Sequence, residues 1–176
     1  MIVLLTGVSG SGKSTIGTLL AARQRWAFED GDALHPPANI AKMRAGIPLT
    51  DTDRWPWLHA VADWMDQRIA AGQQAVVACS ALKRAYRDLL RDGRPQLRIV
   101  FLSVGPDVLA ARLAARHGHF FGASLLDSQL AALEPPGPEE GVLTVEASAP
   151  AAEVVTAITS GLGLVPAPPA PRRPGA

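Results

Sequence analysis

The sequence predicts an α/β domain in which a parallel β-sheet is covered by helices on both faces. Short, almost continuously apolar segments alternate along the chain with segments of helical periodicity. Strands that are apolar on both faces belong to parallel sheets packed between helices. A glycine-rich segment also joins the first apolar run to the first helical segment, as in phosphate-binding α/β folds. A length of 176 residues fits one folded domain.

The elements follow one another in a regular order. Short apolar runs predict five strands, at 2–5, 26–29, 75–79, 98–103 and 142–145. Periodicity and end signals predict helices at 13–23, 36–45, 82–91, 107–116, 123–133 and 151–160. A longer helix is expected from Asp53 to a close at Gly72, because its apolar positions recur at intervals of three and four. Pro56 then falls in its first turn, where a missing N–H is tolerated.

The end of the chain differs in kind. Residues 166–176 hold five prolines among eleven residues and show no apolar periodicity. This composition predicts a polyproline-like or disordered tail, with a proline-rich recognition motif as the alternative. We therefore expect one folded domain over 1–163 and a proline-rich tail over 164–176.

Composition excludes several classes of protein. The formal net charge of +1 argues against a broadly basic nucleic-acid-binding surface. The single cysteine, Cys79, excludes an intramolecular disulfide framework and suits a reducing compartment. The N-terminus lacks the charged start of a signal peptide, and no apolar run reaches the roughly 18 residues of a membrane span. We expect a cytoplasmic protein with neither nucleic-acid nor membrane partners.

The segment Gly7–Ser14 matches G-x-x-x-x-G-K-[ST] in full, between an apolar strand and a helical segment. Its backbone N–H groups are expected to converge on phosphate oxygens at a helix N-terminus. Lys13 would reach the β- and γ-phosphates, and the Ser14 hydroxyl would bind Mg²⁺. The residues expected around the phosphates are Gly7, Ser9, Gly10, Ser11, Gly12, Lys13, Ser14 and Thr15. The chain is predicted to bind ATP, since it has no Asn-Lys-x-Asp guanine-reading motif.

Two carboxylates, Asp30 and Asp32, follow the second predicted strand. Ligands bind at the carboxyl ends of strands in open α/β sheets. One carboxylate can serve the metal and the other the attacking hydroxyl. Asp30 is favoured for the metal, because the third strand ends without a Walker-B aspartate. The alternative is a polar turn in which the aspartates bond to their own backbone.

Basic residues follow the third strand in an unusual place. With Ser80 as the helix N-cap, Lys83 and Arg84 fall in the first turn, where the helix dipole disfavours cations. Arg87 shares the face of Lys83. These positions predict an anionic acceptor molecule that compensates the charges. The alternative is a solvated basic face, partly neutralised by nearby aspartates.

Arg112 and Arg116 lie four residues apart near a helix end, followed by the segment 117–121. They could cap the helix, or a mobile lid at about 116–125 could deliver an arginine to the transferring phosphate. Spacing leaves both readings open. His35 and His119 have no second ligand at metal spacing, so a hydrogen-bonding role is favoured over metal binding.

Together these residues resemble the gluconokinase family of the small P-loop type, over roughly 1–160. The matching motifs are Gly7–Ser14, Asp30–Pro37 with Asn39, Lys42-Met43, Gly46–Asp51, Asp53-Arg54, Pro56–Leu58, Cys79–Lys83, Tyr86–Arg91, Arg116–Phe120 and Ser128-Gln129. The resemblance implies ATP- and Mg²⁺-dependent phosphorylation of the 6-hydroxyl of D-gluconate, giving 6-phospho-D-gluconate and ADP. It also implies a three-layer fold with a five-stranded parallel sheet of order 2-3-1-4-5 and a small lid. Shikimate kinases and nucleoside monophosphate kinases share that fold.

The resemblance implies roles for individual residues. Asp32 would orient or deprotonate the acceptor hydroxyl, Asp30 would join Ser14 at the metal, and Arg116 would act beside Lys13 in catalysis. Arg112 and Arg116 would accompany the ATP phosphates. The residues expected to hold the sugar acid are Asp32, His35, Lys42, Arg54, Ser80, Lys83 and Arg87. The family usually has Met at the position of Phe121, a change expected to alter lid packing and not the chemistry.

Two other functions compete with this one. The chain could phosphorylate another small acceptor, such as shikimate or a nucleoside monophosphate, because the same basic residues would suit those acceptors. It could also be an ATP-binding switch without an acceptor, although such a switch would not need Asp32 or Lys83. The resembled family commonly dimerises, and no sequence feature here demonstrates a homodimer.

Overall fold

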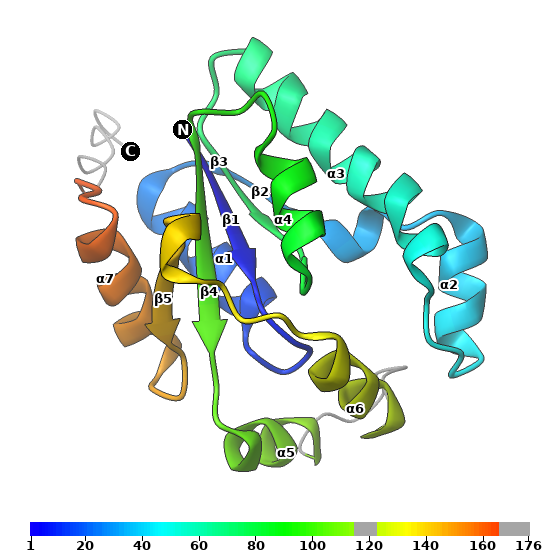
Figure 1. Ribbon diagram of the computed structural model, residues 1–176. Coiled ribbons are helices and arrows are strands. Elements are labelled where there is room, and N and C mark those ends of the chain that lie inside the picture. Colours follow the sequence, from blue (N-terminus) through cyan, green and yellow to red (C-terminus); the bar gives the residue numbers. More distant parts are fainter. Residues whose placement is uncertain (115–122, 166–176) are drawn as a thin grey trace, which may run out of the picture.

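The computed structural model describes residues 1–114 and 123–165, which fold around a five-stranded sheet (Figure 1). Every neighbouring pair of strands is parallel, and their order is β2-β3-β1-β4-β5. The strands are β1 (Ile2–Thr6), β2 (Ala27–Asp30), β3 (Ala75–Ala78), β4 (Leu97–Ser103) and β5 (Leu143–Glu146). The predicted fold class and strand order are confirmed.

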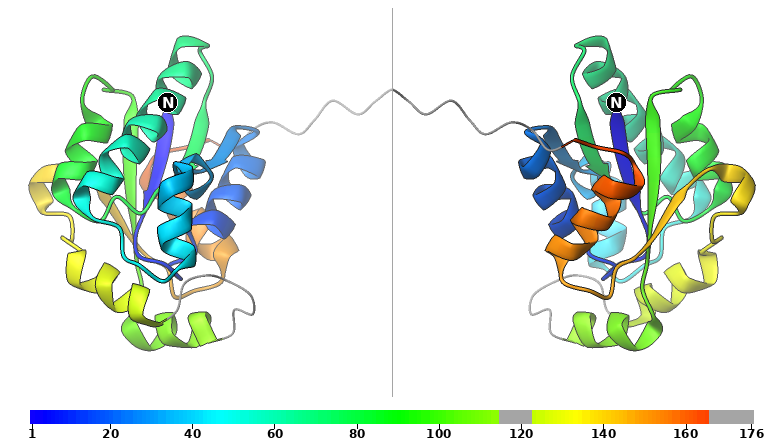
Figure 2. Two further views of the ribbon diagram at one scale, coloured as in Figure 1. Left: turned by 90° about the vertical axis from the view of Figure 1, so that its right-hand side faces the viewer. Right: turned by 90° about the vertical axis from the view of Figure 1, so that its left-hand side faces the viewer.

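Helices cover both faces of this sheet, as the two side views in Figure 2 show. The helices on one face are α3 (Asp51–Ala70) and α4 (Arg84–Arg91). Those on the other face are α1 (Lys13–Gln24) and α7 (Ala151–Gly161). The central strand β1 serves both layers, because successive side chains point to opposite faces. Ile2 and Leu4 pack towards α3 and α4, whereas Val3 and Leu5 pack towards α1 and α7.

Four of the remaining helical segments border the carboxyl ends of the strands: η1 (Gly31–Leu34), α2 (Pro37–Arg44), α5 (Pro106–Ala114) and α6 (Ala123–Ala132). The short turn η2 (Pro138–Glu140) instead leads into the amino end of β5. In Figure 1, α5 and α6 lie beyond the arrowheads of β1 and β4. This edge therefore carries the segments that can enclose a ligand.

Two predicted helix starts are wrong. The long helix begins at Asp51, two residues early, because Thr50 and Asp53 form a capping box: Thr50 Oγ1 accepts from Asp53 N–H, and the Asp53 carboxylate accepts from Thr50 N–H. Pro56 consequently lies in the second turn and not the first. The helix expected to be capped by Ser80 begins at Arg84, because Ala81 has a φ of 38° and so lies outside the right-handed helical region.

Several predictions fall on residues outside the described ranges. Arg116, His119, Phe121 and most of the predicted lid belong to 115–122, and most of the predicted tail belongs to 166–176. Leu164, assigned to the tail from its sequence, packs against the apolar layer of α1 and α7. None of the helices in the described part has the length and apolar character needed to cross a membrane.

Candidate active site

The glycine-rich loop joins β1 to α1, as the motif predicts. Gly7, Gly10 and Gly12 all have positive φ, at 142°, 84° and 95°. At Gly7 a side chain is excluded for a second reason, since a Cβ would lie 2.9 Å from the backbone oxygen of Leu102. Glycine at these positions lets the loop turn tightly into the helix N-terminus, which favours bound anions.

The two side chains expected to serve Mg²⁺ meet in the structure. Ser14 Oγ, in the first turn of α1, donates to Asp30 Oδ2 at the end of β2, over 2.5 Å. Across residues 1–114 and 123–165, no group of three or more His, Cys, Asp or Glu side chains is placed to hold a metal. One carboxylate and one hydroxyl fit Mg²⁺, which takes few protein ligands and completes its shell with phosphates and water. Asp30 Oδ1 also accepts from Asp32 N–H at 3.1 Å, so part of the polar-turn alternative holds as well.

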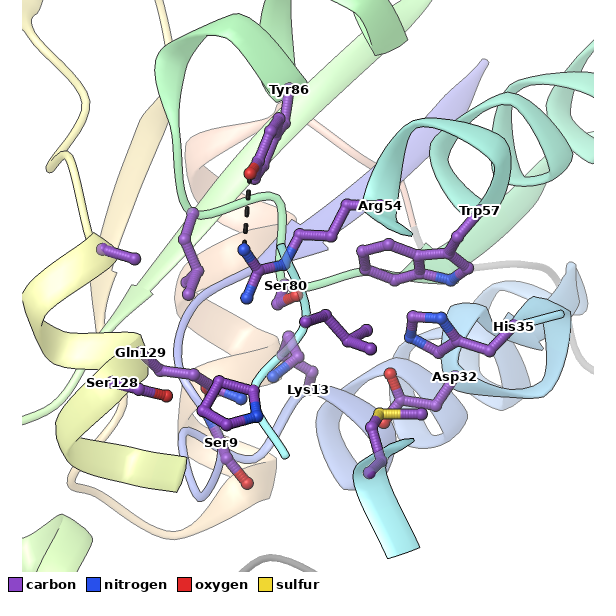
Figure 3. A pocket seen from close by; sticks show the side chains of 15 residues that line it. Ser9, Lys13, Asp32, His35, Arg54, Trp57, Ser80, Tyr86, Ser128 and Gln129 are labelled. Carbon is purple, nitrogen blue, oxygen red and sulfur yellow. Dashed lines mark hydrogen bonds between the residues drawn. The ribbon is translucent and has the colours of Figure 1, made fainter. Parts of the chain in front are cut away.

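A pocket opens beside the phosphate loop, and we call it the central pocket (Figure 3). Its walls come from the phosphate loop, η1, the α2–α3 region, the segment after β3, α4 and α6. The lining residues are Ser9, Lys13, Asp32, His35, Met43, Pro48, Leu49, Arg54, Trp57, Ser80, Leu82, Tyr86, Ser128, Gln129 and Ala132. Residues far apart in sequence thus meet where the phosphate loop and the carboxyl ends of β2 and β3 converge.

Lys13 and Asp32, two of the residues predicted to be catalytic, both line this pocket. Lys13 Nζ donates to the carbonyl oxygens of Gly7 and Val8, at 2.9 and 3.0 Å, which holds the ammonium inside the loop. Asp32 follows in η1 and directs its carboxylate towards the same space (Figure 3). An ammonium group and a carboxylate therefore face one cavity.

His35 is a buried wall of the central pocket, with 8% of its surface exposed. Its ring stacks on Trp57, with centroids 4.1 Å apart and planes 15° from parallel. Trp57 is itself held by a 2.6 Å hydrogen bond from Nε1 to the Gly31 carbonyl. Burial, helped by the charge of Arg54, lowers the pKa of His35 to about 4. The imidazole is therefore neutral near pH 7.

Arg54 carries positive charge into the pocket from α3. Its Nη1 lies 3.5 Å from the Tyr86 hydroxyl and 3.7 Å from Asp51 Oδ1 (Figure 3). The Tyr86 hydroxyl donates to Asp51 over 2.6 Å. Asp51 also accepts from Lys83 at 2.8 Å, a bond that lowers the pKa of Asp51 and raises that of Lys83. Arg54 thus faces the pocket while Lys83 is bound beside it.

Two lysines predicted to bind the acceptor do not line the central pocket. Lys83 is held by Asp51 as described, and Lys42 Nζ lies 2.7 Å from Asp53 Oδ1. The bond from Lys42, with two from Thr50, lowers the pKa of Asp53 to about 2. Both lysines adjoin residues that line the pocket, but each is paired with a carboxylate.

Arg87 does not fulfil its predicted role. Its side chain is 1% exposed, forms a two-bond ion pair with the buried Glu140, and does not line the central pocket. Nη1 donates in addition to the carbonyl oxygens of Leu82 and Glu134, at 3.1 and 3.0 Å. All of the guanidinium nitrogens are therefore used within the protein, and Arg87 joins the segment after β3 to the segment after α6.

The positive charges of the basic face that predicted an anionic ligand are neutralised by carboxylates of the protein itself. Arg84 pairs with Glu139, and Arg94 pairs with Asp66. Together with the Lys83 and Arg87 pairs, four cations of the segment 82–98 form ion pairs with carboxylates outside that segment. Arg84, predicted in the first helical turn, and Arg87, predicted on the face of Lys83, therefore need no anionic ligand to balance their charges.

Sequence reasoning named no role for Gln129, although the Ser128-Gln129 pair was part of the matching pattern. Gln129 Oε1 accepts a hydrogen bond from the backbone N–H of Ser9 over 2.7 Å. Helix α6 thus touches the phosphate loop and lines the central pocket at once. Trp57 and Tyr86 were also missed, because an aromatic residue at helical spacing is indistinguishable from core in a sequence.

A second hollow lies on the other side of the phosphate loop, and we call it the side hollow. Its lining residues are Gly10, Gly12, Thr15, Ile16, Arg112, Ala147, Ala149 and Ala151. Arg112 spans it, with Nη1 3.4 Å from the Gly10 carbonyl and Nη2 2.7 Å from the Ala147 carbonyl. The structure thus places Arg112 and Thr15 beside the phosphate loop, together with the loop after β5.

Comparisons with known proteins agree with one another. A family profile described as an AAA domain matches residues 2–136. The gluconokinase of Gluconobacter oxydans (strain 621H) is 52% identical over 143 residues, covering 81% of this chain and 80% of the relative. The solved gluconokinase from Sinorhizobium meliloti 1021 is 49% identical with a TM-score of 0.82, covering 92% and 90%. An unliganded sugar kinase from Janibacter sp. HTCC2649 is 45% identical with a TM-score of 0.87, covering 94% and 95%.

Proposed function

This chain belongs to the gluconokinase family, and we propose that it transfers the γ-phosphoryl group of ATP to the 6-hydroxyl of D-gluconate, giving 6-phospho-D-gluconate and ADP. The observation that carries the proposal is the central pocket, where Lys13, Asp32, His35 and Arg54 all border one cavity at the carboxyl edge of the sheet. Gluconate has one carboxylate and several hydroxyl groups. Among the residues that the structure describes, Arg54 supplies the guanidinium that lines this pocket, and a guanidinium beside polar side chains suits such a molecule.

ATP would bind across the phosphate loop, with its phosphates on the N–H groups before α1 and its adenosine in the side hollow beside Arg112. Ser14 and Asp30 would hold Mg²⁺. When bound, this ion supplies positive charge to the β- and γ-phosphate oxygens. Arg116 is proposed to act on the same phosphates, and it lies outside the described residues.

In the proposed reaction the 6-hydroxyl oxygen of gluconate forms a bond to the γ-phosphorus while the bond from that phosphorus to the β–γ bridging oxygen breaks. Asp32 orients the hydroxyl and accepts its proton. Lys13 stabilises the charge on the transferring group. Arg54 binds the carboxylate of the acid, and the Ser80 hydroxyl bonds to the sugar chain. Lys42 and Lys83 would help to bind gluconate if their ammonium groups left Asp53 and Asp51, or bound the acid while still paired with them.

The experiment is an acceptor panel with ATP and Mg²⁺, in which ADP release is followed with gluconate, shikimate, nucleoside monophosphates and related sugar acids. Gluconate is expected to give the highest kcat/KM. A preference for shikimate or a nucleotide would replace the proposed acceptor. ATP binding without turnover of any acceptor would instead favour the switch.

We also propose that the enzyme acts in the cytoplasm. The single cysteine, Cys79, is buried and forms no disulfide, which suits a reducing compartment. Its partners would be gluconate and the nucleotide, without nucleic acid or membrane. A homodimer remains an expectation from the family, and sedimentation of the full chain would test it.

A further inference from the structure

The Nδ1 edge of His35 contacts the side-chain amide of Asn39, a residue that has no role in the proposed reaction. Asn39, in the first turn of α2, is 4% exposed. Its Nδ2 lies 3.2 Å from His35 Nδ1 and 2.8 Å from the backbone carbonyl oxygen of Asp53. One buried nitrogen therefore faces two partners, one on the pocket wall and one on α3.

The carbonyl of Asp53 determines how this amide is oriented. A backbone carbonyl oxygen can only accept hydrogen bonds, so it must face the NH₂ end of Asn39 and not its oxygen. The NH₂ group has two hydrogens and no acceptor capacity. With one hydrogen directed at Asp53, the other is available to His35. Nδ1 of His35 must then present a lone pair, and the single proton of the neutral ring lies on Nε2.

We propose that Asn39 is a positioning residue that holds His35 in the Nε2–H tautomer, so that His35 donates a hydrogen bond to a hydroxyl oxygen of the acceptor. The assignment of the bound group rests on the proposed function, whereas the tautomer does not. Asp32 borders the same pocket and, as a carboxylate, only accepts. An acceptor hydroxyl between the two would receive a hydrogen bond from His35 and give one to Asp32. A carbonyl group could not satisfy both residues.

Three neighbours of the ring, Trp57, Arg54 and Asn39, are compatible with a neutral His35 protonated on Nε2. Trp57 covers one face and restrains the plane of the ring, while Asn39 contacts the Nδ1 edge. Burial and, after it, the positive charge of Arg54 on α3 lower the pKa of the ring and so disfavour a second proton on the imidazole. A protonated Nδ1 would also set an N–H against the N–H of Asn39. The neutral ring with Nδ1 unprotonated satisfies all three neighbours.

The direct test is nitrogen NMR of the uniformly ¹⁵N-labelled full chain without ligands. Long-range ¹H–¹⁵N correlations in the imidazole rings distinguish the two neutral tautomers and the cation. The His35 signals are identified by their loss in His35→Gln. We expect the Nε2–H pattern at neutral pH. An Nδ1–H pattern or an imidazolium pattern in the wild-type protein would overturn the proposal, whatever the enzyme phosphorylates.

The variant Asn39→Asp tests the consequence for the acceptor, because a carboxylate accepts where the amide donated. It should move the proton to Nδ1 and raise the gluconate KM by about tenfold or more, while the ATP KM changes less than about twofold. Ala38→Asp is the matched control: it places the same charge on the exposed side of α2 and should leave both the tautomer and the KM values unchanged. A changed tautomer with an unchanged gluconate KM would overturn the assignment of Nε2–H to the acceptor. An unchanged tautomer in Asn39→Asp would overturn the role of Asn39.

Discussion

At the scale of single residues, Asp32 is the side chain on which the proposed chemistry depends most directly. Asp32→Asn keeps the shape of the side chain but removes the proton acceptor, so kcat should fall by about 10²–10⁴-fold. ATP binding should change little, because Lys13 and Ser14 remain in place. Steady-state ADP release and calorimetric titration with ATP measure the two quantities.

Asp63→Asn supplies the control for this prediction, since it makes the same chemical change on an exposed position of α3. It should keep wild-type kcat. An Asp32→Asn enzyme that turns over as fast as Asp63→Asn would remove Asp32 from the mechanism.

Individual residues also show where sequence reasoning succeeds. The phosphate-loop glycines, Ser14 and Asp30 could be predicted, because local motifs and strand ends specify where they lie. Arg87 could not be predicted, since its partner Glu140 lies 53 residues later and only the fold brings the two together. The basic residues after β3 misled for the same reason: a sequence shows charges but not which carboxylates from other elements neutralise them.

At the scale of elements, the Arg87–Glu140 pair connects α4, the segment after β3, and the chain between α6 and β5. The Arg87 guanidinium lowers the pKa of Glu140, and both side chains are almost fully buried, at 1% and 2% exposed. Arg87→Met would leave a buried carboxylate without its partner. Such a loss costs about 3–5 kcal/mol of unfolding free energy.

Arg84→Met is a matched comparison within the same helix. Arg84 also pairs with a glutamate, Glu139, but its side chain is half exposed. Exposed pairs contribute about 0–1 kcal/mol, so this variant should unfold at nearly the wild-type urea concentration. Equal destabilisation of the two variants in urea titrations would contradict the structural role of Arg87.

The strand and helix pattern was predictable element by element, because apolar runs and caps are local signals. The start of α3 was predicted two residues late and the start of α4 two residues early. At α3 the apolar periodicity left out the local Thr50–Asp53 capping box, and at α4 the positive φ of Ala81, which the sequence does not reveal, delays the helix. The strand order followed from the family resemblance and not from periodicity.

At the scale of the whole molecule, His35 makes stability depend on pH. Its pKa is about 4 in the folded chain against 6.5 for the unperturbed group, so below pH 6.5 the unfolded chain binds a proton that the folded chain does not. The unfolding free energy should therefore fall as the pH drops from about 6.5 to 4, by up to about 3 kcal/mol. Urea titrations across this range measure the slope.

His35→Gln should flatten that slope, since glutamine does not titrate. His59→Gln, at an exposed position of α3, should leave the slope as in the wild-type protein. The same slope in His35→Gln as in His59→Gln would show that other groups cause the pH dependence.

The hydrogen bond from Ser9 to Gln129 has a thermodynamic consequence for the complete enzyme. Helix α6 borders the central pocket and also accepts from the phosphate loop, so one contact is shared by the surfaces of both proposed substrates. If ATP alters this contact and thereby changes the affinity for gluconate by some factor, linkage requires gluconate to change the affinity for ATP by the same factor. Either ligand can then bind first, depending on the two concentrations. The coupling free energy between ATP and gluconate is the same for both orders of binding.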